Sequence, residues 1–495
     1  MVIYSLLISI LLEWAIYAVR PLWKVRAYVV SAPLMLTGFM TCAAIVYYPR
    51  WTIGFVIMVA AFRILNQLRI AQGRMHEQYL WHATRRTGLI LGGLQVISIA
   101  LLFVPTIQHS GLMLAYACLQ LAFAAALYGI TTRNIAKTAY RPGDTHYADR
   151  ELPTVTVAIP ARNETSDLEA CLQTIIANDY PKLEILVLDD CSHDRTAEII
   201  RSFAHAGVRF IKGAEPSERW LAKNQAYARL AQEATGELIL FCGVDTRFGP
   251  QAIRALVTTQ LSRNKDMLSV MPRRLTSEVM SVFVQPLRYW WELALPRKLF
   301  NRPPVLSTCW IIRRKRLHKL GGFDAVSHSI LPEGYFAREL VKADGYSFLR
   351  ADDTLDVQTR KTPANQRHTA VRMRYPQIRR RPEIALLLTV MHVAFLLAPF
   401  GIALSALWAG FGLTQLAAIG AVLLLMATHV AIVQVSNPAN VFVAGLSFPL
   451  AIIIELALSY ASMYRYEFST VDWKGRNVCL PVMHAIPHLP PLTDK

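Results

Sequence analysis

The stretch GELILFCGVDTRF, residues Gly236–Phe248, decides how this chain folds. Its centre, LILFC, is an uninterrupted apolar run with the length of a buried strand. The run leads into a turn that carries one acid, Asp245, and glycine stands two residues earlier at position 243. The stretch therefore predicts a buried strand that brings a carboxylate to the edge of a sheet.

The sequence before this stretch alternates strand and helix patterns. TVTVAIPARNE, LEILVLDDCSHDRT and VRFIKG predict strands, and DLEACLQTIIAN, AEIIRSFAHAG and NQAYARLAQEA predict helices. Such alternation predicts a mostly parallel sheet, in which ligands bind at the carboxyl ends of the strands. The polar residues expected at those ends are Arg162, Asn163, Glu164, Asp189, Asp190, Lys223 and Asp245. Neither a Gly-x-Gly-x-x-Gly motif nor a Gly-Lys-Ser phosphate loop occurs, which excludes a dinucleotide fold and a P-loop.

The composition indicates a membrane protein. Of the 495 residues 54% are hydrophobic, and the mean hydropathy is +0.31, which is too apolar for an ordinary soluble protein. The net charge of +18 suits nucleic acid, anionic lipid or phosphorylated substrates. Because no zinc-finger or homeodomain pattern is present, we expect anionic membrane lipids and no nucleic acid. The seven cysteines form no Cys-x-x-Cys pair and predict reduced thiols.

Several apolar runs have the length that crosses a bilayer. We expect spans at Met1–Val19, Ala27–Tyr48, Gly88–Pro105, Gly111–Ile130, Ile384–Trp408, Ala409–Val433 and Val441–Met463. Trp51–Leu65 is short and contains Arg63, so it is either a marginal span or a helix at the interface.

Basic loops give the orientation of a membrane protein. The clusters here are Arg20, Lys24 and Arg26, then Arg63, Arg69, Arg74, Arg85 and Arg86, and then Arg133 and Lys137. If Trp51–Leu65 crosses, all three clusters face the cytoplasm, and so does the soluble middle of the chain. We expect a multi-pass protein of the cell inner membrane. Three later spans would place the C-terminal tail outside the cell, unless a re-entrant segment near Pro438 or Pro449 returns the chain to the cytoplasmic side.

The predicted domains follow from these patterns. They are an N-terminal transmembrane region of four or five spans (1–132), a linker (133–153), a cytoplasmic α/β domain (154–382) with a basic interfacial segment (360–382), about three further spans (383–464) and a tail (465–495).

The motifs IPARNE, VLDDCSHDRT, RWLAKNQA, ELILFCGVDTRF and GGFD resemble, in order and spacing, those of membrane-bound family-2 glycosyltransferases. The resemblance covers about Thr154–Arg360, and the tail VDWKGR resembles that of single-sugar, lipid-directed members. It implies a GT-A domain with a Rossmann-like mixed sheet, inserted between two groups of transmembrane helices. It also implies an inverting, hexosyltransferase-like enzyme that uses a nucleotide-sugar donor, such as a UDP-sugar, and Mg²⁺ or Mn²⁺.

The resemblance also implies a role for individual residues. Those expected to bind the donor are Pro160, Arg162, Glu164, Asp189, Asp190, Lys223 and Arg374. Asp245 is the expected metal ligand, since one carboxylate suffices when donor phosphates supply further oxygens. Lys223 would meet the diphosphate as a mobile charge. The alternative for Asp189 and Asp190 is that they cap the following helix.

Three positions depart from the family pattern. Gly243 replaces the first acid of the metal-binding Asp-x-Asp, and Gly334 replaces the aspartate that usually acts as base in a Glu-Asp pair. Glu333 then takes over as catalytic base, or the acceptor is already anionic, as a polyprenyl phosphate is, or catalysis is lost. VRMRY, residues 371–375, replaces Gln-x-x-Arg-Trp, which disfavours processive synthesis.

The leading hypothesis is a membrane glycosyltransferase that transfers one sugar to a lipid or polyprenyl-phosphate acceptor at the cytoplasmic face. The alternatives are a processive polysaccharide synthase and a donor-binding or scaffolding subunit that has lost its chemistry. The basic run Arg360, Lys361, Arg367, Arg372, Arg374, Arg379, Arg380 and Arg381 either binds anionic headgroups or holds a phosphate-bearing acceptor.

Overall fold

A computed structural model of the protein describes residues 2–47, 53–72, 77–103, 110–142, 147–217, 220–274, 280–284, 286–295 and 303–478. Arg74, one of the basic residues counted above, lies outside these ranges. The chain divides into two compact units. The first contains Met1–Ala117, Ala370–Ala398 and Leu456–Lys495, and the second contains Cys118–Thr369 and Pro399–Glu455.

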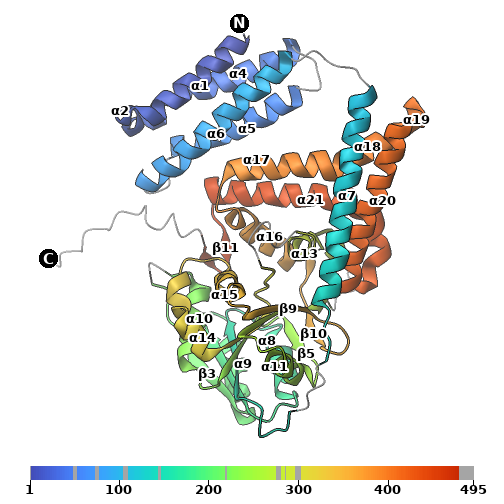
Figure 1. The fold of residues 1–495 in the computed structure, drawn as a ribbon. Helices are drawn as coiled ribbons and strands as arrows, with labels where there is room; N and C mark the ends of the chain where they lie inside the picture. The colour runs from blue at the N-terminus through green and yellow to red at the C-terminus, as the bar shows by residue number, and fades with distance from the viewer. Residues whose placement is uncertain are drawn as a thin grey trace, which may run out of the picture. The chain divides into compact units, whose positions relative to one another are not determined.

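The second unit contains a mixed seven-stranded sheet with the order β3-β2-β1-β4-β8-β6-β9. Its two outer strands, β3 and β9, are labelled in Figure 1. Its strands are β1 (Val155–Ala161), β2 (Leu183–Asp189), β3 (Val208–Lys212), β4 (Leu238–Cys242), β6 (Met267–Met271), β8 (Cys309–Arg313) and β9 (Tyr346–Arg350). The first four run parallel to one another, β8 runs antiparallel to both of its neighbours, and β9 is parallel to β6. The α/β expectation is confirmed.

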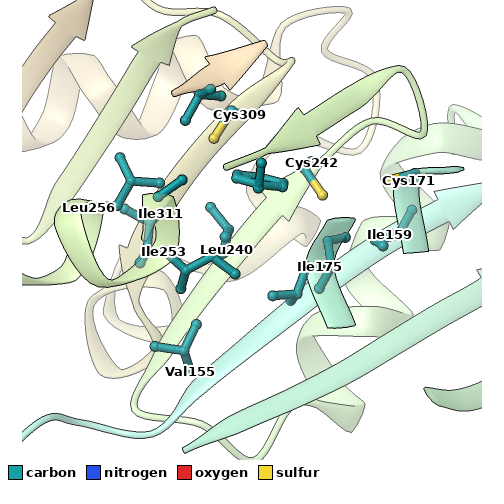
Figure 2. Close-up of a cluster of buried hydrophobic side chains, with 14 of the residues drawn as sticks. Val155, Ile159, Cys171, Ile175, Leu240, Cys242, Ile253, Leu256, Cys309 and Ile311 are labelled. Atoms are coloured by element: carbon teal, nitrogen blue, oxygen red, sulfur yellow. The ribbon is translucent and has the colours of Figure 1, made fainter. Parts of the chain in front are cut away.

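Both faces of this sheet are buried, as its apolar strands predict. Val157 and Leu240 point into one core with α8 and α11, whereas Ala158 and Phe241 point into the other with α10 and α15. The covering helices are α8 (Leu168–Ile176), α9 (Thr196–Ser202), α10 (Ala222–Glu233), α11 (Ala252–Ser262), α14 (Arg314–Lys319) and α15 (Pro332–Val341). Figure 2 shows three cysteines, Cys171, Cys242 and Cys309, among apolar side chains of the first core. All six cysteines among the described residues are free thiols, as expected.

A second sheet of three strands lies at the carboxyl end of β4. Strand β10 (Val357–Thr359) is central, antiparallel to β5 (Thr246–Phe248) and parallel to β7 (Arg273–Arg274). Its register places Thr359 opposite Thr246 on one side and opposite Arg274 on the other. Three distant segments therefore meet directly beside Asp245.

The remaining elements of the second unit are short connecting elements and one long apolar helix, α20. They are η1 (Ala204–Ala206), α12 (Ser281–Val284), α13 (Pro286–Leu293), η2 (Gly322–Val326), α19 (Ala406–Ala409), α20 (Leu413–Ser436) and η4 (Pro438–Asn440). Helix α13 packs on α20, where Trp290 Nε1 lies 3.1 Å from His429 Nδ1 and the Trp290 ring stacks on Phe448.

The first unit is helical. Its helices are α1 (Val2–Ala18), α2 (Arg20–Lys24), α3 (Arg26–Val29), α4 (Ser31–Tyr47), α5 (Ile53–Gln72), α6 (Glu77–Phe103) and α17 (Pro382–Met391), followed by a π-helical segment, η3 (His392–Leu397). Four more helices contain residues of both units: α7 (Ser110–Thr138), α16 (Pro363–Gln377), α18 (Ala398–Leu404) and α21 (Val441–Phe468). Strands β11 (Asp472–Trp473) and β12 (Arg476–Asn477) form a hairpin from the VDWKGR motif, with Lys474 and Gly475 at positive φ in its turn.

Within the described residues, six helices are long and apolar enough to cross a membrane, judged by length and composition. They are Arg26–Ile45, Ile53–Gln72, Gly111–Thr138, Pro382–Ala409, Leu413–Ser436 and Pro438–Phe468, and Ile3–Ala18 is a shorter apolar helix. Apolar helices thus precede and follow the α/β sheet in the chain, as expected. The domain boundaries assigned above remain a prediction.

Two arginines that we counted as loop charges are buried inside α5, which corrects the orientation argument. Arg63 donates through Nε and Nη2 to Glu13, at 3.1 and 2.9 Å. Arg69 donates to Glu467 at 2.7 Å, and Arg380 also pairs with Glu467. The acidic partners neutralise these arginines, so Arg63 and Arg69 cannot be counted among the basic loop residues that indicate the cytoplasmic side. Of the stretch Trp51–Leu65, expected to be a marginal span or an interfacial helix, the described residues belong to the 20-residue α5. Where a re-entrant segment was considered, Pro438 begins the short η4 and Pro449 lies inside α21.

Candidate functional site

The ends of β1 and β2 are joined by reciprocal hydrogen bonds between the loops that follow them. The Asn163 backbone N–H donates to Ser192 Oγ at 3.0 Å, and the His193 N–H donates back to Asn163 Oδ1 at 3.0 Å. Asn163 and Cys191 both take positive φ, 50° and 54°, which short polar residues tolerate better than most. The two loops therefore form one rigid rim at the edge of the sheet.

The predicted donor-binding residues of β1 and β2 gather at this rim. Asp189 and Asp190 are buried, and Arg162 Nη1 donates to the backbone oxygens of Asp190 and Cys191 at 2.6 and 2.8 Å. Pro160 lies within β1, and the Glu164 N–H donates to Thr196 Oγ1 at 2.8 Å. Arg162 thus braces the turn that carries the acids, and the donor-binding roles of all five residues remain a prediction.

The helix after β2 is capped by a different aspartate. Asp194 Oδ1 accepts from the Thr196 N–H at 3.0 Å and from Thr196 Oγ1 at 2.5 Å, at the first residue of α9. Asp189 Oδ1 accepts from the Ser192 N–H at 3.3 Å, within the turn. Asp194 thus bonds the first N–H of α9, while the donor-binding and capping roles considered for Asp189 and Asp190 both remain predictions.

Asp245 follows β4 and is held by residues of the second sheet. Its Oδ2 accepts from Thr359 Oγ1 at 3.2 Å and lies 3.3 Å from Lys361 Nζ, and its carbonyl accepts from the Arg360 N–H at 2.9 Å. Burial raises the pKa of Asp245, but Lys361 and Thr359 outweigh it, so this pKa lies below its ordinary value. The carboxyl is therefore ionised at neutral pH.

Gly243 leaves the space into which the Asp245 carboxylate folds. A Cβ at position 243 would lie 2.6 Å from Asp245 Oδ1. Any other residue here would force that carboxylate to shift, and with it the contact to Lys361. Glycine in place of the first acid, at position 243, is therefore what allows the observed conformation of the Asp245 carboxylate.

Glu333 lies in the first turn of α15 and is fully buried. Neither of its carboxylate oxygens has a hydrogen-bond partner among the described residues. Burial raises the pKa of Glu333 above its ordinary value, although the nearby charges of Lys223 and Arg288 act in the opposite direction. A buried carboxyl without a partner is costly, and such groups are concentrated at sites of proton transfer.

Tyr227, a buried residue of α10, is influenced by the charges of both Glu333 and Asp245. Lys223 Nζ lies 5.1 Å from the centroid of the Tyr227 ring, a cation–π contact. Burial raises the pKa of Tyr227, and Glu333, Cys242 and Asp245 add to the increase through their charges. Lys223 thus contacts the buried Tyr227, and the charges of Glu333 and Asp245 both act on it.

Gly334 is surrounded by enough space for a side chain. A Cβ there would meet its nearest atoms, on Leu331 and Val305, at 3.8 Å, an ordinary van der Waals distance. Its helical backbone also does not require glycine. An aspartate would fit this position, so packing does not explain why glycine stands there.

Eight of the nine predicted site residues belong to the second unit, whereas Arg374 in α16 belongs to the first. Its donor-binding role remains a prediction. Thr359 and Arg274 were not among the predicted site residues, and Lys361 was expected to bind anionic headgroups or to hold a phosphate-bearing acceptor. No local pattern could have found them, because only the pairing of β10 with β5 and β7 brings them to Asp245.

Residues 156–321 match the family model described as glycosyl transferase family 2. The chain is 29% identical over 185 residues to the probable glycosyltransferase YdaM of Bacillus subtilis, covering 35% of this chain and 44% of that protein. It is 32% identical over 124 residues to a 4,4'-diaponeurosporenoate glycosyltransferase of Staphylococcus aureus, covering 25% and 32%. The chain thus spans less than half of the length of either relative.

Among solved structures, the mannosyltransferase PcManGT from Pyrobaculum calidifontis in complex with GDP-Man and Mn²⁺ is similar with a TM-score of 0.43 and 18% identity. The match covers 70% of this chain and 99% of that one.

Proposed function

Residues 156–321 form a glycosyl transferase family 2 domain, and from this premise we propose that the protein is a membrane glycosyltransferase. It transfers one sugar from a nucleotide-sugar donor, a UDP-sugar, to a lipid acceptor. The observation that carries the proposal is Glu333, a fully buried carboxyl without a hydrogen-bond partner among the described residues. Its charge and that of Asp245 both act on the buried Tyr227. The name of the diaponeurosporenoate glycosyltransferase relative supports an acceptor of lipid character.

The proposed reaction is an inverting displacement by which a hexose is transferred. The acceptor oxygen attacks the anomeric carbon, and the bond from that carbon to the nucleoside diphosphate breaks, with the electron pair leaving on the diphosphate. Glu333 takes the proton of the acceptor hydroxyl, which its raised pKa favours. The rim residues, including Asp189 and Asp190, hold the nucleoside, and Lys223 approaches the diphosphate.

Asp245 is the residue that fits a divalent cation. Among the described residues no three His, Cys, Asp or Glu side chains group together as metal ligands. Mg²⁺ and Mn²⁺ nevertheless bind through one carboxylate when substrate phosphates provide further oxygens. We propose that either ion binds Asp245 only together with the donor, where it would neutralise charge on the leaving diphosphate.

The apolar helices support placement in a membrane, and we propose the cytoplasmic face of the cell inner membrane for the catalytic domain. The exposed Arg85 and Arg86 support this orientation. Basic residues of α16 and the turn that follows it would contact anionic lipid headgroups. Arg380 and Arg381 are already paired, with Glu467 and Glu383, and contribute less to such contacts.

A subunit that has lost its chemistry is the second candidate, favoured by Gly243 and Gly334. Against it, an unpartnered Glu333 costs stability and brings no benefit to a protein without turnover. The processive alternative has no supporting contact among the described residues. Product length on a gel separates it from single-sugar transfer.

Transfer and hydrolysis of UDP-sugars by the detergent-purified protein test the proposal. With Mn²⁺ present, we expect Asp245→Asn to lower turnover about 100-fold or more, because the anionic ligand beside the leaving group is lost. Asp344→Asn is the matched control, since Asp344 also pairs with a lysine, Lys265, but is almost fully exposed. We expect it to keep wild-type activity.

Wild-type protein that binds no nucleotide sugar and transfers none with Mg²⁺ or Mn²⁺ would contradict the proposed function. Binding without turnover across phospholipid, glycolipid and polyprenyl-phosphate acceptors would favour the inactive subunit instead.

A further inference from the structure

The second sheet places an arginine beside Asp245. Thr246, Thr359 and Arg274 form one row across β5, β10 and β7. Residues opposite one another on neighbouring strands extend their side chains to the same face of a sheet. Thr359 Oγ1 donates to Asp245 Oδ2 from this face, at 3.2 Å. The side chain of Arg274 therefore extends to the face on which Thr359 meets the Asp245 carboxylate, and the charge of Asp245 acts on Arg274.

Arg274 is buried but has guanidinium nitrogens free for a ligand. It is 7% exposed, and its Nε and Nη1 have no hydrogen-bond partner among the described residues. Its neighbour Arg273 contrasts with it, since Arg273 forms an ion pair with the exposed Asp353. A buried arginine with two unused donors is costly to retain without an anion that occupies them.

Other charges nearby agree with an anion site. Burial lowers the pKa of Arg274 to about 10, which Tyr289 and Asp245 oppose and Arg288 reinforces, so the guanidinium stays charged at neutral pH. Arg288 lies on α13 and also acts on Glu333. The formal charges of Asp245 (−1), Lys361 (+1) and Arg274 (+1) sum to +1 before any metal or substrate binds.

We propose that Arg274 binds phosphoryl oxygens of the substrate through Nε and Nη1. This inference rests on the proposed function and adds a binding residue to it. The diphosphate of the donor is the expected source, because Arg274 lies beside Asp245, the residue proposed to meet that diphosphate through a metal. The planar fork of a guanidinium matches two phosphoryl oxygens at once. Arg274 thereby supplies positive charge at a turn where Gly243 has removed one metal ligand.

The test compares Arg274→Met and Arg274→Lys with Arg273→Met, the matched control, in the full-length protein in detergent. Titration calorimetry measures the binding of UDP, uridine and inorganic pyrophosphate. Loss of charge-assisted hydrogen bonds should weaken UDP and pyrophosphate binding about 10- to 100-fold in Arg274→Met and leave uridine binding unchanged. Arg274→Lys should recover only part of the affinity, and Arg273→Met should bind like the wild type.

A second arm separates the two possible sources of the phosphoryl group. Protein in nanodiscs is titrated with a short-chain polyprenyl phosphate and with the matching polyprenol. Weaker binding of the polyprenyl phosphate alone, with UDP unaffected, would assign Arg274 to the acceptor and keep the phosphoryl site. Unchanged binding of UDP, pyrophosphate and polyprenyl phosphate in Arg274→Met would overturn the inference.

Thermal unfolding distinguishes a loss of ligand binding in Arg274→Met from a loss of folded structure. Removing a buried charge without a partner should leave the melting temperature of Arg274→Met equal to or above that of the wild type. A lower melting temperature with equal losses of uridine and UDP binding would contradict the inference. If the wild type binds pyrophosphate but neither UDP nor another nucleoside diphosphate, the proposed function fails while the Arg274 site remains testable with pyrophosphate.

Discussion

Buried charged side chains differ in their hydrogen-bond partners between the apolar helices of the first unit and the α/β domain of the second. Arg63 donates from two nitrogens to Glu13, and Gln67 and Tyr17 donate to the same carboxylate, while Arg63 Nη1 has no partner among the described residues. Glu333 and Arg274 are as deeply buried, yet both oxygens of Glu333 and two nitrogens of Arg274 have no partner among the described residues.

This difference in partners distinguishes charged side chains with a structural role from those whose partner would be a ligand. An ion in an apolar helix is tolerated when a partner and further hydrogen bonds surround it, as they do at Glu13. An unpartnered ion lowers stability and persists where substrate binding or proton transfer needs it. Substituting one charge in each region tests this reading.

The largest effect is expected at Glu333. Glu333→Gln should lower the transfer rate about 10²- to 10⁴-fold, because a positioned base is lost. Transfer assays across pH measure this, and wild-type activity should rise with pH as Glu333 ionises. Glu339→Gln, on the same helix but partly exposed and paired with Lys342, is the control. Full activity in Glu333→Gln would show that the acceptor needs no base, as a lipid phosphate would not.

The same substitution should stabilise the fold. Because the pKa of Glu333 is raised in the folded protein, its contribution to stability is present below the unfolded pKa and is lost as pH rises through the folded one. The melting temperature of Glu333→Gln should therefore exceed that of the wild type by more at pH 8 than at pH 4.5. An equal difference at both pH values would contradict the raised pKa.

Arg63 should show the opposite sign of stability change. Arg63→Met leaves Glu13 buried without its counter-ion and should cost about 3–5 kcal/mol of unfolding free energy. The double variant Glu13→Gln with Arg63→Met should recover most of that loss. Thermal unfolding in detergent measures both, with Leu11→Ala on the exposed face of α1 as the control. A double variant as unstable as Arg63→Met would rule out the pair as the cause.

The smallest effect is expected from restoring the acid that Gly334 replaces. Gly334→Asp in the Glu333→Gln background should raise transfer about 10-fold, since the space at position 334 admits a side chain. Replacing a helical glycine in the first turn of α15 by an acid should also add about 1 kcal/mol of stability. Transfer rates and melting temperatures check the two effects separately. A more stable variant with no gain in transfer would place residue 334 away from the reacting atoms.

The sequence by itself determined the elements whose signal is local. Apolar runs predicted β1 to β4 and the long helices, because a buried strand or span needs an unbroken apolar segment wherever it lies. The order of the acidic strand ends placed Asp189, Asp190 and Asp245 at one edge, since parallel strands share their carboxyl ends.

Only the tertiary structure decided which charges meet. The sequence presents Lys361 and Arg63 only as members of basic clusters, but in the structure Lys361 pairs with Asp245 and Arg63 pairs with Glu13. Arg274 and Thr359 lie far apart in the chain, and the register of β10 alone brings them to the same carboxylate. Pairing across a sheet or between helices depends on geometry that no short stretch of sequence encodes. The role of a charged side chain depends on how deeply it is buried and on which residue it pairs with, and both are decided only in the folded protein.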